Sequence, residues 1–398
     1  MTEAFIVAAA RTAGGKKGGR LSGWHPVDLA AQVLNALVDR AGAGVGSGMD
    51  PALVEDVIMG CVDQAGEQGV NVARNAVLAS RLPESVPGTS IDRQCGSSQQ
   101  ALHFAAQAVM SGTMDIVIAA GVESMTRVPI GMPATLPQKH GFGFYMSPEI
   151  SARYPGGAFS QFVGAEMMAK KYGLSKEALD LYAFTSHQRA MAATSSGAFN
   201  EEIVGIEAIL ADGTRTGEPH LIDEGIRFNA TLEGISSVKL LQEGGCISAA
   251  NASQICDGAS GVMVVNERGL KTLGVQPLAR IHHMSVLGHD PVIMLEAPLP
   301  ATERALKKAG MRIDDIDLFE INEAFASVPL AWLQHSGADP ARMNINGGAI
   351  ALGHPLGASG TKLMTTLVYS LKQQGKRYGL QTMCEGGGMA NVTIIERL

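Results

Sequence analysis

Apolar and polar positions along the first third of the chain follow two different periods. Residues 5–9, 54–61 and 114–121 are short apolar runs that predict strands, the last of them buried on both faces. Residues 27–40 and the region around 70–79 instead carry apolar side chains at helical spacing. Strands that alternate with helices indicate an α/β domain in which helices cover a sheet.

The same order of elements returns in the last third of the chain. The returning segments are a strand, a helix, a second strand, a glycine-ended segment, a long helix and a final strand, at residues 277–285, 300–309, 313–321, 343–348, 357–374 and 377–384. This repetition predicts two related halves. If the halves pack face to face, their corresponding strand ends converge and loops from both halves meet.

The segment between the halves differs from them in composition and periodicity. Residues 128–157 are rich in proline and show no sustained period, so we expect a long covering loop there. Helices are expected at residues 162–172 and 176–196, the second capped by Ser175. We therefore expect an N-terminal half at residues 1–121 with about 251–270. We expect a loop or lid domain at residues 122–250 and a C-terminal half at residues 271–398.

Composition and charge exclude several classes of protein. The 398 residues are 46% hydrophobic and 17% charged, which indicates a compact fold, and the net charge of −7 argues against nucleic acid or a membrane as main partner. The five cysteines form no Cys-x-x-Cys pair, and His282, His283 and His289 lack a carboxylate or cysteine at ligand spacing. We therefore expect no disulfide framework and no metal site. Without a signal-like or spanning segment, the expected compartment is the cytoplasm.

The first candidate for chemistry is Cys95, which lies where an extended segment gives way to a helix ending at Ser111 and Gly112. Unpaired N–H groups and the positive end of the helix dipole favour a thiolate at such a position. The same N–H groups can bind an oxyanion. The alternative interpretation is an inert core thiol, because free cysteines are among the most buried residues.

Three further residues occupy comparable positions at strand and helix ends. His354 lies in a glycine-dense loop at residues 347–360, where the backbone can approach a ligand closely; it is either a base for Cys95 or a hydrogen-bonded structural histidine. Cys384 ends an apolar strand and, taken alone, would be a core cysteine. Asn322 follows another strand, and its alternative role is a helix N-cap.

Four short motifs, in this order, resemble the signature blocks of the thiolase family. They are Gln-Cys-Gly-Ser around Cys95, Asn-Glu-Ala-Phe from Asn322, Gly-His-Pro around His354 and Cys-x-Gly-Gly from Cys384. The resemblance runs nearly end to end, since further family segments match at residues 11–12, 121–125, 251–253 and 257–259. It implies a thiolase-like layered α-β-α-β-α fold from two related halves, with an inserted loop domain.

The resemblance also implies an acyltransferase reaction. This is coenzyme A-dependent cleavage of a 3-ketoacyl-CoA to acetyl-CoA and a shortened acyl-CoA, or the reverse Claisen condensation, through an acyl-cysteine intermediate. Cys95 would be the nucleophile, His354 its base, and Cys384 the group that exchanges a proton with the α-carbon. Asn322, through a bound water, would join His354 in stabilising the enolate. The N–H groups of Cys95 and Gly386 would hold the acyl-enzyme carbonyl.

For coenzyme A, the resemblance implies a substrate and no tightly bound cofactor. Arg227 would lie against the adenine, while Ala249, Ser253, Ala324 and Phe325 would line the pantetheine tunnel. Because family members are dimers or tetramers, we expect a homodimer or homotetramer.

Some positions depart from the family pattern. Glu385 stands where a small or apolar residue is usual, and a carboxylate there would tend to raise the pKa of Cys384. Ser98 and Asp92 replace a common glycine and asparagine, and residues 160–166 match the lid motif only in part, so the acyl group is left open. The alternative functions are a decarboxylating condensing enzyme, a non-catalytic acyl-CoA or lipid-binding protein, and a cysteine hydrolase.

Overall fold

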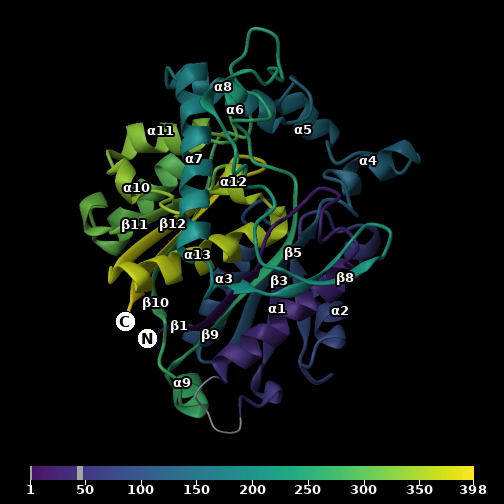
Figure 1. Cartoon of the computed structure of the whole chain (residues 1–398), viewed down its shortest axis with the longest axis vertical. Coiled ribbons are helices and arrows are strands. Elements are labelled where there is room, and N and C mark those ends of the chain that lie inside the picture. The colour runs from purple at the N-terminus through teal and green to yellow at the C-terminus, as the bar shows by residue number, and fades with distance from the viewer. Residues whose placement is uncertain (1, 43–47) are drawn as a thin grey trace.

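The computed structural model describes residues 2–42 and 48–398 (Figure 1). The first half of the fold contains β1 Phe5–Thr12, β2 Gly15–Lys16, α1 Pro26–Ala41, β3 Asp56–Gly60, α2 Val72–Ala79, β4 Gly88–Ile91, α3 Ser97–Ser111, β5 Ile116–Ser124 and, after the lid, β9 Cys256–Val265. The lid contains α4 Met132–Lys139, α5 Pro148–Arg153, α6 Gln161–Lys171, α7 Lys176–Ser196, β6 Ile203–Val204, β7 Ile206–Ile209, β8 Arg215–His220 and α8 Leu232–Ser236. The remainder contains α9 Glu267–Leu273, β10 Ala279–Gly288, α10 Pro298–Ala309, β11 Leu318–Ile321, α11 Ser327–Ser336, α12 Ala349–Leu352, α13 Ser359–Gln374, β12 Tyr378–Glu385 and β13 Met389–Arg397.

Both halves use the same strand order and the same strand directions. The first half runs β4-β3-β5-β9-β1, in which β3 is parallel to β4 and β5, and β9 is antiparallel to β5 and β1. The second half runs β11-β12-β13-β10, in which β11 is parallel to β12, and β13 is antiparallel to β12 and β10. Strands β1 and β10 join the two sets. The repetition read from the sequence is therefore a repetition of topology.

One strand of the first half has no full counterpart in the second. The segment that corresponds to β4 by sequence order is 343–348, but there Met343 makes only an isolated parallel bridge to Phe319 of β11. The short helix α12 follows instead. The second half thus has room for a longer connection before its middle helix.

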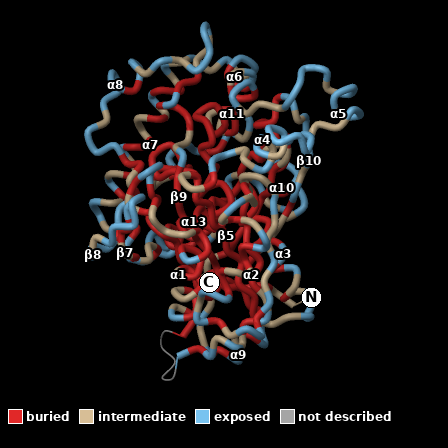
Figure 2. Tube along the Cα trace, turned by 90° about the vertical axis from the view of Figure 1, so that its right-hand side faces the viewer, coloured by how far each residue is buried: buried red, intermediate tan, exposed pale blue. Residues whose placement is uncertain are grey.

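The helices form three layers around the two sets of strands. Helices α1 and α2 pack on one outer side through a cluster that includes Leu34, Leu37 and Val57. Helices α3 and α13 contact each other in the middle and pack against strands of both halves, while α10 and α11 belong to the core of the other outer side. Figure 2 shows the buried residues concentrated in this centre. This is the α-β-α-β-α layering that the resemblance implied.

Helix α13 is buried along nearly all its length although it contains several hydroxyl side chains. Those hydroxyls have partners. Thr365 Oγ1 donates to the Thr361 carbonyl at 2.8 Å, and Thr366 Oγ1 donates to Glu202 Oε1 at 3.1 Å. Buried polar groups with hydrogen-bond partners avoid the cost of desolvation, so this helix can occupy the middle layer. Its place matters because the loop before it carries His354.

The lid differs in one respect from the sequence prediction. The expected irregular loop contains α4 and α5, each with proline at one of its first two positions, where the fixed φ favours a first helical turn. Ser147 caps α5 by accepting from the Ile150 N–H at 3.2 Å. The predicted cap at Ser175 is confirmed, since its hydroxyl accepts from the Ala178 N–H at 3.3 Å. Within residues 2–42 and 48–398, no helix has the length and apolarity needed to cross a membrane.

Candidate active site

Cys95 lies in a tight turn between β4 and α3. Gln94 adopts a left-handed backbone conformation with φ of 49°, which is uncommon for a residue with a side chain and costs energy. The turn is held by hydrogen bonds from the Gly96 N–H to the Arg93 carbonyl at 3.1 Å and from the Ser97 N–H to the Gln94 carbonyl at 3.0 Å. Cys95 is half-buried, directly before the helix N-cap Gly96. This position fits a reactive thiol better than a core thiol.

Cys384 reaches the same place from the other half. It lies near the end of β12, next to the glycine turn that leads into β13, and is 1% exposed. A Cβ on Gly386 would lie 2.7 Å from Gln94 Oε1, and a Cβ on Gly96 would lie 1.9 Å from Glu385 Oε1. The two loops therefore pack directly on each other, with glycine at each contact.

Both thiols hold their protons in the absence of substrate. Burial and, after it, the carboxylate charge of Glu385 raise the pKa of Cys95 to about 12. Burial also raises the pKa of Cys384 well above its usual range, with further contributions from Cys95 and then Glu385. The effect of Cys95 on Cys384 is a second sign that the two sulfurs are neighbours. Cys95 therefore needs a base, whereas Cys384 is suited to donating a proton.

His354 lies between α12 and α13 and is 4% exposed. Ser359 Oγ donates to the Pro355 carbonyl at 2.9 Å, so its oxygen accepts from His354 Nδ1 at 2.5 Å. This assigns the proton to Nδ1 and leaves Nε2 as a hydrogen-bond acceptor. Burial, together with the charge of Lys362, lowers the pKa of His354 to about 3. The imidazole is thus neutral, with an unprotonated Nε2.

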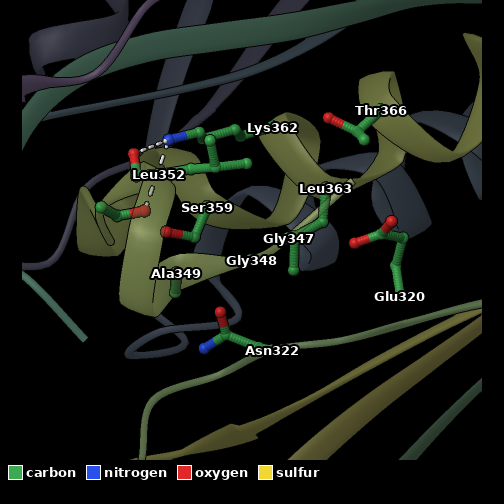
Figure 3. A pocket seen from close by; sticks show the side chains of 11 residues that line it. Glu320, Asn322, Gly347, Gly348, Ala349, Leu352, Ser359, Lys362, Leu363 and Thr366 are labelled. Atoms are coloured by element: carbon green, nitrogen blue, oxygen red, sulfur yellow. Dashed lines mark hydrogen bonds between the residues drawn. The ribbon is translucent and has the colours of Figure 1, made fainter. Parts of the chain in front are cut away.

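Asn322 lies beside His354 Nε2. Its Nδ2 is 3.4 Å from His354 Nε2, and its Oδ1 is buried without a hydrogen-bond partner among the described residues. The alternative role as a helix N-cap is wrong, because α11 begins later and its N-cap is Ala326. Figure 3 shows the Asn322 side chain directed toward Ala349 and Ser359.

Two buried carboxylates that the sequence reading did not assign hold these loops in place. Glu323 accepts from Tyr182 at 2.9 Å, from Ser186 at 2.7 Å and from the Ile350 N–H at 3.1 Å, which joins the Asn322 loop to α7 and α12. Glu123, at the end of β5, accepts from the Val62, Asp63 and Gly357 N–H groups. Glu123 thereby ties the first half to the loop that carries His354. A glutamate within two residues of the end of an apolar strand was the available signal for both.

Lys362 has a related role. Its ammonium donates to the Leu352 carbonyl at 2.6 Å and the Gly353 carbonyl at 3.3 Å (Figure 3). It also lies 3.6 Å from Asp223. Asp223 also pairs with Arg11 at 2.9 Å. These buried charges are paired, as low-dielectric surroundings require, and they fix the backbone just before His354.

The cavity drawn in Figure 3 lies behind Asn322. It has a volume of about 10 Å³, is bounded by Glu320, Asn322, Lys362 and Thr366, and is lined by neither thiol. A space of this size holds roughly one water molecule. The cavity is therefore too small to be the substrate channel, and neither sulfur borders it.

The residues expected to bind coenzyme A lie in segments that contact one another. Arg227 and Ala249 line a small hollow with His187 and Gln254. In the adjoining segments, the Ser253 N–H donates to the Ala324 carbonyl at 2.9 Å, and Ala252 pairs with Phe325. The Gln254 carbonyl accepts from the His354 backbone N–H at 3.0 Å, which links these segments to the His354 loop.

Apolar side chains of the lid lie next to the segment that contains Phe325. Phe162 of α6 is 50% exposed and packs edge-to-face on Phe325, with ring centroids 5.7 Å apart. Other large apolar lid residues are also exposed, among them Ile130, Leu136, Phe142, Phe144, Tyr145 and Val163. The Gly131 N–H at the start of α4 donates to Asp63 Oδ1 at 2.7 Å, which ties the lid to the first half.

Comparisons with known proteins find relatives over the whole length of this chain. The model of the thiolase N-terminal domain matches residues 4–268, and that of the thiolase C-terminal domain matches residues 275–397. A steroid 3-ketoacyl-CoA thiolase of Mycobacterium tuberculosis is 52% identical over all of this chain and 95% of its own length. A 3-ketoacyl-CoA thiolase of Pseudoalteromonas translucida is 41% identical over the full length of both chains. The crystal structure of the Bacillus anthracis acetyl-CoA acetyltransferase superposes with a TM-score of 0.89, at 34% identity, over 100% of this chain and 99% of that one.

Proposed function

Because this chain belongs to the thiolase family and is an acyltransferase, we propose that Cys95 takes up the acyl group when a 3-ketoacyl-CoA is cleaved by coenzyme A. The observation that carries this assignment is the direct packing of the Cys95 turn on the Cys384 turn. A cysteine thioester conserves the energy of the substrate thioester, so the acyl group can pass on to a second thiol.

In the first step, His354 removes the thiol proton of Cys95. Its neutral imidazole with an unprotonated Nε2 supports this role. The thiolate adds to the 3-keto carbon, and the bond between the α- and β-carbons then breaks. The bonding electrons remain on the acetyl fragment as an enolate, and Cys95 is left as an acyl thioester.

The enolate charge is met by the proton now on His354 Nε2 and, through a bound water, by Asn322, whose Nδ2 lies beside that nitrogen. Preorganised donors of this kind are each worth roughly 3–4 kcal/mol. Cys384 gives its proton to the enolate carbon, which releases acetyl-CoA. The Cys384 thiolate then takes the proton of an incoming coenzyme A thiol, which attacks the acyl thioester. Cys95 leaves as thiolate and recovers its proton from His354.

In that second step, the N–H groups of Cys95 and Gly386 are proposed to hold the thioester carbonyl oxygen. The contact between Gly386 and Gln94 brings the two N–H groups into neighbouring loops. Coenzyme A is proposed to lie along Arg227, Ala249, Ser253, Ala324 and Phe325, because these residues lie in contacting segments that are linked to the His354 loop.

The test is to trap the acyl group. Intact-mass analysis after brief exposure to acetoacetyl-CoA should show one acetyl adduct, mapped by peptide digestion to Cys95. Cys95→Ser should lose both adduct and turnover, while Cys246→Ser should retain both. Full turnover by Cys95→Ser would overturn the assignment. Condensation of a malonyl thioester without cleavage of acetoacetyl-CoA would instead favour a decarboxylating enzyme.

For the acyl group, we propose a bulky ring system carried as a 3-ketoacyl-CoA. Support comes from the relative of Mycobacterium tuberculosis that is named for steroid substrates, and from the exposed Phe162 beside Phe325. A panel of 3-ketoacyl-CoA esters of graded size tests this. The ratio kcat/KM should rise with ring bulk, and Phe162→Ala should reduce it for ring substrates while leaving acetoacetyl-CoA nearly unaffected. A preference for short linear chains would contradict the proposal.

We further propose that the enzyme is a homodimer or homotetramer in the cytoplasm. Light scattering coupled to size-exclusion chromatography distinguishes these states from a monomer of 41.5 kDa. Cell fractionation tests the compartment.

A further inference from the structure

Glu385 is a buried carboxyl group that the proposed reaction does not use. It follows Cys384 in β12, and successive strand residues point to opposite faces, so its side chain is directed away from Cys384. Its oxygens reach Gly96 instead, close enough that a Cβ there would lie 1.9 Å from Oε1. The Glu385 carboxyl thus lies against the residue that follows Cys95.

This carboxyl is poorly partnered. Glu385 is fully buried, and neither Oε1 nor Oε2 makes a well-formed hydrogen bond to a described residue, although the Asn391 backbone N–H lies close enough to lower the pKa of Glu385. Arg93 is the cation whose charge lowers the pKa of Glu385, but its Nη1 is directed at the Met389 sulfur, 3.8 Å away. A buried carboxylate without a partner is costly, so the group favours its neutral form. Burial raises the pKa of Glu385 to about 8, against the lowering effect of Arg93.

The other charged and titratable groups around it come from four elements. Asp92 and Arg93 lie in the turn with Cys95, Cys384 lies on β12, Glu123 lies near the end of β5, and His103 of α3 contacts the Asn391 side chain at 3.2 Å. Burial lowers the pKa of His103 to about 3, so it stays neutral. Burial raises the pKa of Glu123 to about 7 against the effect of its N–H donors, and among the carboxylates named Glu123 contributes least to the raised pKa of Cys95. Glu385 contributes most among them.

We propose that Glu385 controls the nucleophile: its carboxyl, when protonated, allows Cys95 to ionise, and when ionised, opposes the thiolate across Gly96. Glu385 is a positioning residue in the electrostatic sense, because it acts through Cys95 and contacts no substrate. The inference rests on the proposed role of Cys95. Its consequence is that acylation is lost on the alkaline side, where an ordinary thiol would become more reactive.

The test measures the ionisation of Cys95 without requiring turnover. Wild type and Glu385→Gln are exposed to iodoacetamide at pH values from about 6 to about 10, and alkylation of the Cys95 peptide is followed by mass spectrometry. At about pH 9 the variant should react about tenfold faster, since a neighbouring charge within a few ångströms shifts a pKa by roughly one unit or more. Cys246, which contacts Glu166 elsewhere, is the internal control and should react equally in both proteins.

A second readout is the pH dependence of kcat/KM. The wild-type value should fall above about pH 8, and this alkaline limb should be missing in Glu385→Gln. Glu385→Val serves as a second variant if the glutamine form folds poorly, because an apolar side chain carries no desolvation cost. Identical Cys95 alkylation profiles in wild type and the folded variants would overturn the inference. Full turnover by Cys95→Ser would instead overturn the proposed nucleophile, so the two failures are distinguishable.

Discussion

The turns that precede α3 and α13 occupy equivalent places in the two halves, yet they present different chemistry. Before α3, the strand β4 leads into a tight turn with one left-handed residue, and Cys95 is half-buried. Before α13, the corresponding strand is missing, α12 is inserted, and His354 is almost fully buried. The repeated topology therefore sets where a side chain is presented, whereas the local loop sets its burial and its proton affinity.

The largest expected effect comes from the second of these turns. His354→Ala removes the base and should lower kcat by about 10²–10⁴-fold with KM nearly unchanged. Ser359→Ala, which only releases Nδ1, should have a smaller effect and serves as the matched control. Steady-state assays with acetoacetyl-CoA measure both. Equal losses in the two variants would mean that His354 acts only through packing.

The second prediction concerns Asn322, which follows β11 in the second half. Asn322→Ala removes one enolate donor and should lower kcat by about 10²–10³-fold, as removal of a preorganised donor does. Acylation of Cys95 by a simple acyl-CoA forms no enolate and should be much less affected. If both reactions slowed equally, Asn322 would be required for the fold of the site and not for the enolate.

Gly96 tests how closely the two turns pack. Gly96→Ala places a methyl group where Glu385 Oε1 lies, so the variant should lose about 1–3 kcal/mol of unfolding free energy. Glu385→Ala in the same chain should restore part of that loss, because the space becomes free. Denaturant unfolding of the two single variants and the double variant gives the coupling energy. Strictly additive losses would show that the clash is absent.

The last prediction concerns the pH dependence of stability. The pKa of Glu385 rises from an ordinary 4.5 to about 8 in the folded protein, so between these values the native state holds a proton that the unfolded state releases. The contribution of Glu385 is therefore fully present below about pH 4.5 and is lost as the pH rises through 8. Glu385→Gln lacks this dependence. The Tm of the variant minus that of wild type should increase across this window; a constant difference would contradict the shifted pKa.

Much of the fold could be read from the sequence because its signals are local. The apolar runs at β1 and β5 and the helical spacing of α1 and α7 survive into the structure with small changes of boundary. The lid helices α4 and α5 were missed because their first turns depend on proline and serine at their starts and on few apolar contacts. The missing counterpart of β4 was also not visible, since residues 343–348 follow the same order of elements without forming the same strand.

The sequence by itself determined the class of enzyme, because four motifs at strand ends, in a fixed order, specify two thiols, an imidazole and an amide. Only the tertiary structure decided how these groups are surrounded. It places Glu385 against Gly96 beside Cys95 and not toward Cys384, and it gives Glu123 the task of tying the His354 loop to the first half. The physical reason is that the direction and burial of a side chain depend on which distant segments pack around it. That packing sets the proton affinities of the side chains, and it cannot be predicted from the local pattern of residues along the sequence.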